Sequence, residues 1–304
     1  MSLAVIIFNV GRGLCVAIQT PSNRLVLIDC GNLDDFSPVA WLAERKQQFQ
    51  ARNGYALTKL IITHPHNDHI ADIEQITNLL PPSIILRHAD LDWSRVLSGY
   101  EPTQALTHYR EHYCPPHYCG SIPPDQMPDW GDGMTLNHYS ISSAASAQVS
   151  ASDNAYVNNL SFATVLKYRS YTFVFMGDNE TEGTDALLAA HPALRNEVGI
   201  HRTVTGGLAG GVHFLVAAHH GHPSGFSTGW FQLTGPTKIF NVVSERRAGP
   251  REEPSRVAVD SRYSSADFSL GQNHEQRRMV STRCDGHIVL TVDDKNQWNW
   301  RAIS

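Results

Sequence analysis

The chain has 304 residues, of which 41% are hydrophobic and 17% charged, and this is the composition of an ordinary globular protein. The net charge of −5 argues against a protein that coats nucleic acid over its whole surface, but it leaves room for a local basic groove. We find no basic leader and no apolar run of about 18 residues, so we expect neither a signal peptide nor a membrane partner. The five cysteines are odd in number and scattered, which favours reduced thiols in the cytoplasm.

The first 80 residues predict a β-meander followed by helices and one buried strand. Apolar stretches over residues 3–10, 14–18 and 25–28 are separated by turns that contain Gly or Pro, as is typical of strands. A helix is expected over residues 38–50, because apolar side chains recur on one face. A short apolar strand over residues 60–62 then leads into a second helix over residues 70–80, which two prolines end.

Residues 88–152 contain many prolines and a stretch rich in Ser and Ala, and they predict an irregular excursion with one helix over residues 102–113. We interpret this segment as an inserted cap or lid, because it lacks the repeated apolar periodicity of a second domain. Further along, the pattern predicts a hairpin over residues 160–168 and 171–176, a helix over 184–195, and strands over 214–217, 239–243 and 287–292. No internal repeat is visible, so residues 1–304 are expected to form a single domain.

Several predicted strands end in residue types that bind metal ions. The strand over residues 60–62 delivers the string Thr63-His64-Pro65-His66-Asn67-Asp68-His69. Three other strands lead to Asp29, to Asp178 and to the pair His219-His220. Loops beyond strand ends gather ligands from distant parts of a sequence, so we expect these side chains to form one metal site.

The spacing within this set indicates how two ions would be held. In an extended loop His64 and His66 point the same way, so both imidazoles reach one ion. Asp68 and His69 lie where the chain turns into the helix and face a second ion, while an aspartate such as Asp178 bridges both ions through its two oxygens. Imidazole with carboxylate suits zinc, and also manganese or iron where oxygen ligands dominate. We therefore expect two divalent metal ions, zinc in the first place and manganese as the alternative.

The elements of this set differ in specificity. A Gly-Asp pair after a strand is usually only a turn, and a His-His pair is usually a surface feature or a hydrogen-bonded core pair. Asp29 alone would be an ordinary turn residue. The His-x-His-x-Asp-His string is far more specific, because it places four ligand-type residues in six positions between an apolar strand and a helix. The hypothesis of a metal site rests on that string.

These motifs resemble those of the metallo-β-lactamase superfamily. In particular, they resemble the metallo-β-lactamase-like domain at the C-terminus of the bacterial competence DNA-uptake channel protein and its free-standing relatives. The resemblance spans nearly the whole chain. It rests on Asn9-Val10-Gly11-x-Gly13, Leu27-Ile28-Asp29-x-Gly31, Thr63-His64-x-His66-x-Asp68-His69, Asn158-Asn159-x-Ser161, Met176-Gly177-Asp178, His219-His220-Gly221 with Ser224, and Ser281-Thr282 with Gly286.

The resemblance implies a four-layer αββα sandwich, in which two mixed sheets face each other and helices lie outside. It also implies an assignment of ligands: His64 and His66 to one ion, Asp68 and His69 with one of His219 and His220 to the other, and Asp178 to both. Asp29 would orient the ligand loop from behind the ligands. The sequence does not decide between His219 and His220.

Two departures from the family pattern affect the site. Many relatives supply a third histidine to the first ion from the loop before the Asp178 hairpin, whereas residues 153–159 contain no histidine. The first site is then expected to be rich in oxygen ligands, weakly occupied, or completed by water or an asparagine carbonyl. In addition, Ala71-Asp72 replaces the two glycines that often follow the motif, which narrows the space near the site.

The expected activity is hydrolysis by a metal-bound hydroxide, which attacks phosphorus or a carbonyl carbon. Asp68 or Asp178 is expected to hold the remaining proton of the water, and His220 to protonate the leaving oxygen. The resemblance favours a phosphodiester or nucleotide substrate, as for a nuclease or a small-nucleotide phosphodiesterase. Two alternatives stay open: a carboxyl-ester or lactone hydrolase, and a metal-binding nucleotide sensor with little turnover. The oligomeric state and the physiological substrate do not follow from the sequence.

Three other groups of residues are candidates for ligand binding. A loop with several arginines binds phosphates on one interpretation and is a solvated loop on the other, because glutamates partly cancel its charge: Arg246, Arg247, Arg251, Arg256 and Arg262. A second group lies in one Pro-containing loop, which favours a plain loop over a zinc site: His112, Cys114, His117 and Cys119. The aromatic residues of the inserted segment are candidates for stacking on bases: Trp93, Tyr100, Tyr109, Tyr113, Tyr118 and Trp130.

Overall fold

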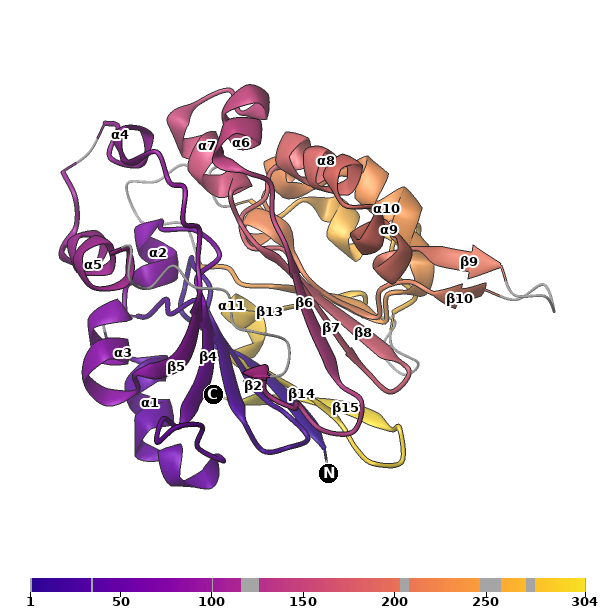
Figure 1. Ribbon diagram of the computed structural model, residues 1–304. Coiled ribbons are helices and arrows are strands. Elements are labelled where there is room, and N and C mark those ends of the chain that lie inside the picture. Colours follow the sequence, from indigo (N-terminus) through magenta and orange to yellow (C-terminus); the bar gives the residue numbers. More distant parts are fainter. Residues whose placement is uncertain are drawn as a thin grey trace. The chain divides into compact units, whose positions relative to one another are not determined.

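The computed structural model describes residues 2–33, 35–99, 101–115, 126–202, 208–246, 258–271 and 277–303. Contacts within the chain divide it into two compact units, residues 1–134 with 286–304 and residues 135–285. Each unit combines a mixed β-sheet with helices (Figure 1), which confirms the α/β class expected from the sequence. The single domain expected over residues 1–304 stays a prediction. Over the described residues, no helix has both the length and the apolar character needed to cross a membrane.

The described strands of the first unit form one sheet in the order β15-β14-β1-β2-β3-β4-β5. Neighbouring strands are antiparallel from β15 to β3, whereas β3, β4 and β5 are parallel. The strands are β1 (Leu3–Ile7), β2 (Val16–Gln19), β3 (Leu25–Ile28), β4 (Leu57–Ile61), β5 (Pro82–Leu86), β14 (His287–Val292) and β15 (Trp298–Ile303).

The parallel pair β3 and β4 determines where the sequence motifs of this unit meet. Every residue of both strands is buried, as expected for parallel strands that are covered on both faces. Ile28 lies opposite Ile61, and the backbone N–H of Asp29 donates to the carbonyl of Ile61 at 2.8 Å. The carboxyl ends of the two strands therefore lie side by side, which brings Asp29 to the start of the histidine loop.

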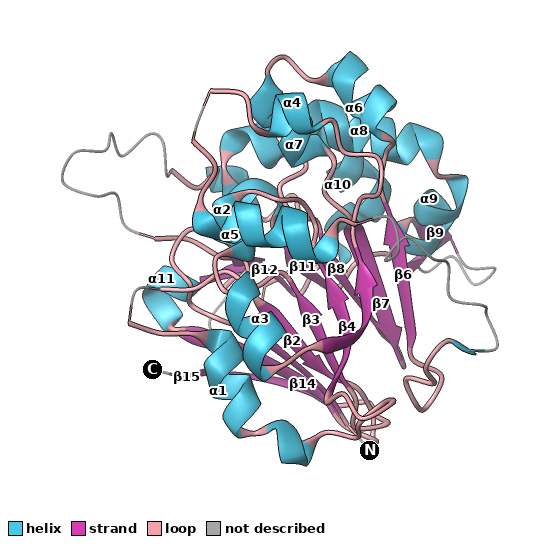
Figure 2. Cartoon of the chain, turned by 60° about the vertical axis from the view of Figure 1, so that its left-hand side comes forward, coloured by secondary structure: helices cyan, strands magenta, loops and turns pink. Residues whose placement is uncertain are grey.

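The helices of the first unit are short. Figures 1 and 2 show α1 and α3 side by side on one face of the sheet, and they bury Val39 and Leu42 from α1 and Ile73 and Ile76 from α3. The helix predicted over residues 102–113 is an α-helix that continues as a π-helix. The helical elements are α1 (Pro38–Glu44), η1 (Lys46–Gln48), α2 (Asn67–Ile70), α3 (Ile73–Leu79), α4 (Trp93–Val96), α5 (Gln104–His108) and the π-helix η2 (Tyr109–Tyr113).

The second unit contains a sheet with the order β13-β12-β11-β8-β7-β6 among its described strands, and a separate hairpin of β9 and β10. Strands β13, β12, β11 and β8 are parallel, and β8, β7 and β6 are antiparallel. The strands are β6 (Thr135–Tyr139), β7 (Ala163–Tyr168), β8 (Tyr171–Phe175), β9 (Ile200–Arg202), β10 (Leu208–Gly210), β11 (Phe214–Val216), β12 (Phe240–Val243) and β13 (Met279–Ser281).

Helices α8, α9 and α10 cover one face of this second sheet (Figure 1). Leu187, Leu194 and Trp230 from these helices join Val165 and Leu215 from the sheet in one buried cluster. The helical elements are α6 (Ser143–Val149), α7 (Asp153–Asn159), α8 (Thr181–Ala190), α9 (Pro192–Val198), η5 (Ala218–Gly221), η6 (Pro223–Gly225), α10 (Thr228–Thr234), η7 (Gly235–Thr237), η9 (Ser261–Ser264) and α11 (Thr282–Asp285).

The segment expected to be irregular, residues 88–152, differs from its prediction at its C-terminal end. Strand β6 pairs with β7 in the sheet of the second unit, and α6 follows it as a regular helix. The serines that suggested a loop cap helices here, because the Ser142 and Ser152 hydroxyls accept hydrogen bonds from Ala145 N and Ala155 N. The preceding part contains α4, α5 and η2, which belong to the first unit.

Candidate metal centre

The histidine string occupies the turn between β4 and α2 in the first unit. His64 and His69 are buried, whereas His66 and Asp68 are half-buried. His66 is the N-cap of α2, and its carbonyl accepts the backbone N–H of His69 at 2.9 Å. The Cys30 N–H donates to the His69 carbonyl at 2.8 Å, which ties this turn to the end of β3.

Asp29 holds the ligand loop from behind, and its carboxylate is completely buried. One carboxylate oxygen accepts the backbone N–H of Thr63 at 2.7 Å, while the other accepts the Thr63 hydroxyl and His69 Nδ1, both at 2.7 Å. Burial raises the pKa of Asp29, and the interactions with His69 and Thr63 act against that rise. This arrangement turns Nδ1 of His69 toward the protein, in the way that outer partners orient metal-binding histidines.

The imidazoles of His64, His66 and His69 converge. His64 Nε2 lies 3.0 Å from His66 Nδ1, and the ring centroids of His64 and His69 are 4.2 Å apart. Two nitrogen ligands of one tetrahedral zinc ion lie about 3.4 Å apart, since each is about 2.1 Å from the metal. The donor types and their spacing in this unit therefore fit a divalent metal ion.

Two glycines lie so close to the ligand loop that a side chain at either position would collide with it. Gly13 has a φ of +125°, and a Cβ added there would clash with the carbonyl oxygen of Asp68. A Cβ on Gly31 would lie 2.5 Å from the same oxygen. The fold therefore gives a physical reason for glycine at positions 13 and 31, because the backbone carbonyl of Asp68 lies against both of them.

In the second unit, Asp178 and the histidine pair follow the parallel strands β8 and β11. The His219 N–H donates to the Gly177 carbonyl at 3.0 Å, and His219 and His220 both adopt left-handed backbone conformations with φ near 50°. His220 Nε2 lies 3.1 Å from Asp178 Oδ2. Strained conformations at two successive non-glycine residues are often associated with function. The spacing of His220 and Asp178 again fits two ligands of one ion.

A polar network around His219 was not found from the sequence. Ser224 Oγ lies 2.8 Å from His219 Nδ1 and 3.0 Å from His222 Nδ1, and Glu180 Oε1 lies 3.8 Å from His219 Nδ1. Burial raises the pKa of Glu180, although a hydrogen bond from Asn158 acts against that rise. A carboxylate two positions beyond Asp178, and a third histidine after His219-His220, were the signals available in the sequence.

Asn158 occupies the region where relatives carry the third histidine. Its side-chain amide donates to Glu180 Oε1 at 2.9 Å, and Oδ1 is buried without a hydrogen-bond partner among the described residues. A buried, unsatisfied carbonyl oxygen is costly unless something binds it. Asn159 supports the same corner, because its Oδ1 accepts the backbone N–H of Glu180 at 2.8 Å. The second unit thus offers oxygen donors where the family pattern has a nitrogen donor.

The structure describes some members of the arginine, His/Cys and aromatic groups named from the sequence. Arg262 forms an ion pair with Asp260 at 2.6 Å and lies over the ring of Phe226, so it is engaged locally. Among the aromatic residues, Tyr109, Tyr113 and Trp130 are buried. Arg247, Arg251, Arg256, His117, Cys119, Tyr100 and Tyr118 lie outside the described residues, so the predictions about them stay predictions.

The family model of the metallo-beta-lactamase superfamily matches residues 8–130, which include Asp29 and the whole histidine string. Over these residues the chain is similar to the metallo-β-lactamase superfamily. Proteins of the metallo-β-lactamase superfamily are generally hydrolases that depend on divalent metal ions, which confirms the coarse class expected from the sequence. The finer resemblance to the competence DNA-uptake protein stays a prediction.

Several solved structures are similar to this chain. The metallo-beta-lactamase fold protein YhfI from Bacillus subtilis is 14% identical, with 70% of each chain covered and a TM-score of 0.33. Zn(2+)-bound PqqB from Methylobacterium extorquens is 11% identical, with 96% of this chain and 100% of that chain covered and a TM-score of 0.38. A protein of unknown function from Enterococcus faecalis V583 is 11% identical, with 70% and 49% covered and a TM-score of 0.35. No curated protein matches the chain.

Proposed function

We propose that this protein is a metal-dependent phosphodiesterase, either a nuclease or an enzyme that acts on a small nucleotide. The observation that carries the proposal is the convergence of His64, His66 and His69 at the end of β4, with His69 fixed by the buried Asp29. A structural role alone gives no reason to gather three imidazoles around one turn. The phosphodiester substrate rests on the resemblance of the motifs to those of the competence protein.

The proposed cofactor is a pair of divalent ions. His64 and His66 would hold one ion, Asp68, His69 and His220 would hold the other, and Asp178 would contribute to both. That the two units serve the same ions rests on the order of the motifs and on the superfamily. Lewis acidity, which activates water and neutralises negative charge on the phosphate, is the chemistry that such ions supply.

The residues behind the ligands orient them. Asp29 and Thr63 fix the ring of His69, and Ser224 fixes the ring of His219 through its Nδ1. The separation of 3.1 Å between His220 Nε2 and Asp178 Oδ2 supports His220, not His219, as the ligand of the pair. On this proposal His220 binds metal, and the earlier expectation that it protonates the leaving oxygen is not needed.

Zinc is the proposed metal, with manganese as the alternative. Three imidazoles in the first unit favour zinc. The oxygen donors of the second unit, Asn158 Oδ1 and the carboxylates of Asp178 and Glu180, favour manganese. Among the described residues no disulfide joins the cysteines Cys15, Cys30, Cys114 and Cys284, in keeping with the proposed cytoplasmic location.

Elemental analysis and a substrate panel test the proposal. Protein purified without added metal is expected to contain close to two transition-metal ions per chain and to hydrolyse bis(p-nitrophenyl) phosphate but not p-nitrophenyl acetate. Turnover of the acetate alone would favour the ester hydrolase. Stoichiometric metal without turnover of either substrate would favour the sensor. Absence of metal, with none taken up on adding zinc or manganese, would refute the metal site itself.

Two variants locate the site. His66→Ala and Asp178→Asn are each expected to abolish hydrolysis while leaving the circular dichroism spectrum unchanged, because the buried core lies elsewhere. Asp178→Asn is expected to lose more metal, since the proposal gives Asp178 to both ions. His201→Ala is the matched control, because His201 is exposed in β9 and outside the proposed site. Full turnover in Asp178→Asn would show that the site lies elsewhere in the chain.

A further inference from the structure

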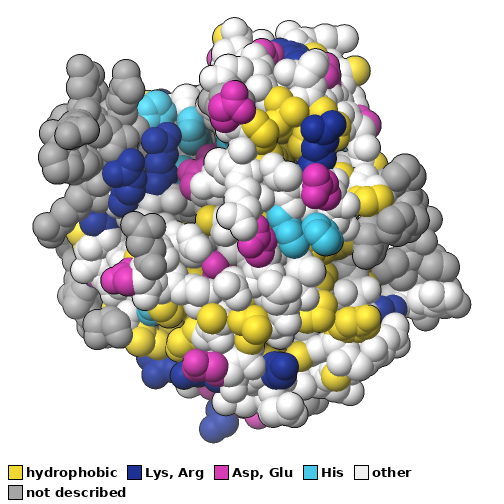
Figure 3. Space-filling view, turned by 90° about the vertical axis from the view of Figure 1, so that its left-hand side faces the viewer, with side chains coloured by type: hydrophobic (Ala, Val, Ile, Leu, Met, Phe, Trp, Pro, Cys, Tyr) yellow, Lys and Arg dark blue, Asp and Glu magenta, His cyan; other side chains and the backbone are white. Residues whose placement is uncertain are grey.

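A cavity of about 540 Å³ lies in the first unit between α4 and the continuous helix of α5 and η2. A volume between roughly 300 and 1,000 Å³ is typical of sites for small molecules. Figure 3 shows this side of the molecule, where hydrophobic side chains gather together with single acidic and basic ones. The lining residues are Trp93, Leu97, Pro102, Leu106, Thr107, Arg110, Glu111, Cys114 and Pro115.

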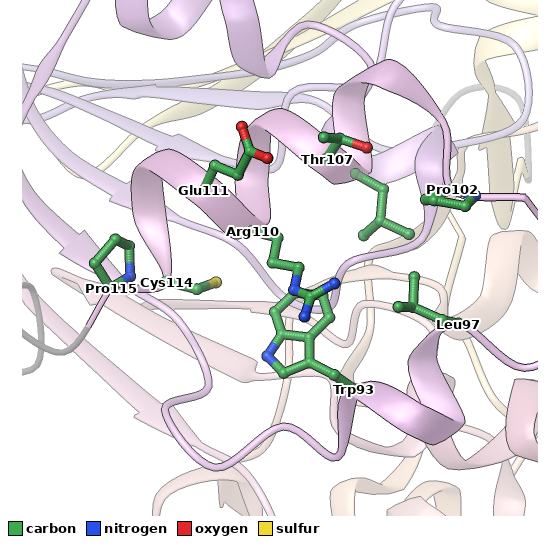
Figure 4. A pocket seen from close by; sticks show the side chains of 9 residues that line it. Trp93, Leu97, Pro102, Thr107, Arg110, Glu111, Cys114 and Pro115 are labelled. Atoms are coloured by element: carbon green, nitrogen blue, oxygen red, sulfur yellow. The ribbon is translucent and has the colours of Figure 1, made fainter.

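One wall of the cavity pairs an aromatic ring with a cation. The Arg110 guanidinium carbon lies 5.2 Å from the centroid of the Trp93 ring, and Trp93 is only half-buried. Figure 4 shows Arg110 reaching from the helix toward the indole, while Glu111 points away on the other side of the helix. No hydrogen bond or ion pair joins Arg110 to another residue in the described part of the chain. Its N–H groups are thus available to an anion.

Apart from Thr107 and Glu111, the rest of the lining is apolar, and it offers contact to a flat ring. Leu97 and Pro102 lie at one end and Cys114 and Pro115 at the other (Figure 4), and Leu106 also lines the cavity. An aromatic ligand gains both contact with these side chains and stacking on the indole face. A guanidinium beside an aromatic surface is suited to hydrogen-bond a phosphate or a carboxylate with two N–H groups at once.

The helix that lines the cavity departs from regular α-helical geometry at its C-terminal end. Residues 109–113 form a π-helix, a conformation that occurs mostly as short insertions and often at functional sites. Leu106, Arg110 and Cys114 are four residues apart, a spacing that puts side chains on one face of a helix, and all three line the cavity. Tyr109 and Tyr113 in the same helix are buried.

Hydrogen bonds join the lining helix to the elements that carry the histidine string. The Thr103 hydroxyl donates to Asn67 Oδ1 at 2.7 Å, and the Gln104 amide donates to Glu74 Oε2 at 3.1 Å. Asn67 belongs to α2 and Glu74 to α3. The wall that contains Arg110 is therefore a fixed part of the first unit.

We propose that this cavity binds a small molecule that combines a planar aromatic ring with an anionic group. The ring lies against Trp93 and the apolar lining, and the anion accepts hydrogen bonds from Arg110. A nucleoside monophosphate and an aromatic carboxylate share this chemistry. The proposal does not depend on metal binding or on hydrolysis, so it can hold even if the proposed phosphodiesterase activity fails.

Isothermal titration calorimetry on the full chain tests the proposal, with four probes: adenosine 5′-monophosphate, indole-3-acetate, adenosine and inorganic phosphate. The two aromatic anions are expected to bind at least about tenfold more tightly than adenosine or phosphate alone, because each of those lacks one of the two interactions. Tighter binding of the monophosphate identifies a phosphate as the anion, and tighter binding of indole-3-acetate identifies a carboxylate. Absence of heat with both aromatic anions would refute the proposal.

Variants separate this cavity from the metal centre. Arg110→Gln is expected to lower the affinity for both aromatic anions about tenfold and to leave the affinity for adenosine unchanged. Trp93→Leu is expected to lower the affinity for both aromatic anions and for adenosine severalfold. Arg169→Gln is the matched control, because Arg169 also lies 5.2 Å from an aromatic ring, that of Tyr168, but outside the cavity. Binding is expected to persist in His66→Ala. Loss of binding in His66→Ala, or equal affinity in Arg110→Gln, would place the ligand elsewhere and overturn the proposal.

Discussion

Asp29 combines a left-handed backbone conformation with a fully buried carboxylate. Its φ of 56° is one that aspartate and asparagine adopt more readily than most residues. That conformation turns the chain at the end of β3 so that both carboxylate oxygens face Thr63 and His69. The residue therefore acts on the candidate metal centre through the position of His69, without being one of the proposed ligands.

Asp29→Asn tests this positioning role. Asparagine keeps the volume and tolerates the left-handed backbone, but one acceptor oxygen becomes an NH₂ group that cannot accept from His69 or Thr63. We expect the affinity for zinc to fall by about 10- to 100-fold, as for other partners that orient metal-binding histidines. Competition with a chromophoric zinc chelator measures the affinity for zinc. Asp132→Asn is the control, because Asp132 also has a left-handed φ (49°) but is exposed. Equal zinc affinity in both variants would contradict the role of Asp29.

Gly13→Ala tests the packing of the ligand loop on the glycine. The new methyl group would meet the Asp68 carbonyl while the backbone keeps a φ that alanine disfavours. We expect a loss of about 3 kcal/mol in the free energy of unfolding, together with weaker metal binding. In the matched control Gly54→Ala, φ is also positive (+85°) but no atom lies within 4 Å, so only about 1 kcal/mol should be lost. Urea denaturation of both variants gives the comparison, and equal losses would exclude a contribution from the Asp68 contact.

Contacts between residues that are close in the sequence could be predicted, whereas contacts between residues far apart in the sequence could not. The histidine string lies within seven consecutive residues, so its convergence follows from local geometry. The contact between Glu180 and Asn158 joins residues 22 positions apart, and it depends on where α7 lies beside the end of β8. No spacing rule gives that placement. The sequence therefore predicted the residues of the histidine loop and missed the polar network around His219.

At the level of elements, Asp72 fastens the start of α1 to the helices that follow the ligand loop. Its carboxylate accepts hydrogen bonds from the Ser37 hydroxyl at 2.5 Å, from the Asn32 amide at 2.8 Å and from Val39 N at 3.4 Å. Its own N–H donates to the Cys30 carbonyl at 2.8 Å. The aspartate that replaces a family glycine thus links three segments of the first unit.

Asp72→Ala is expected to lower the free energy of unfolding by about 3 kcal/mol, because the half-buried donors on Ser37 and Asn32 lose a charged acceptor. Urea denaturation followed by circular dichroism measures the change. Asp294→Ala serves as the control, since Asp294 is exposed in the turn between β14 and β15, and it should change stability by less than about 0.5 kcal/mol. A loss in Asp72→Ala no greater than in the control would show that these hydrogen bonds add nothing to stability.

The elements that were predicted are those whose apolar pattern is continuous. Strands β3, β8 and β14 lie close to their expected positions. Strand β5 was missed, because Pro82 was interpreted only as the end of a helix, although proline is tolerated as the first residue of a strand. Helices α6 and α7 were missed because a Ser- and Ala-rich composition resembles a loop, whereas the serines act as N-caps.

At the level of the whole molecule, each unit buries one lysine. Lys59 lies within β4, and burial lowers its pKa to about 8. Lys238 precedes β12, donates to the Gly235 carbonyl at 2.6 Å and lies 4.8 Å from the ring of Phe231, and burial lowers its pKa to about 7. In the unfolded chain a lysine has a pKa of about 10.4. Above these lowered values the unfolded chain binds more protons than the folded one.

The free energy of unfolding is therefore expected to rise with pH between 7 and 8.5, since stability increases wherever the unfolded state binds more protons. From the two pKa values, Lys238 contributes a rise of about 1.5 kcal/mol over this window and Lys59 about 1 kcal/mol. Above this window the buried thiols of Cys15 and Cys30, whose pKa values are raised by burial, act in the opposite direction. Urea denaturation at constant ionic strength across the window measures the slope.

Substituting each lysine separates its contribution to the pH dependence of stability from that of all other titrating groups. Lys238→Met and Lys59→Met keep most of the apolar stem, remove the charge and should each remove its own share of the slope. The larger change is expected for Lys238, because its pKa lies at the lower end of the window. Lys46→Met is the control, since Lys46 is exposed and its removal should leave the slope unchanged. If Lys238→Met follows the same pH dependence as the original chain, then Lys238 does not lose its proton in this window and its share of the slope is refuted.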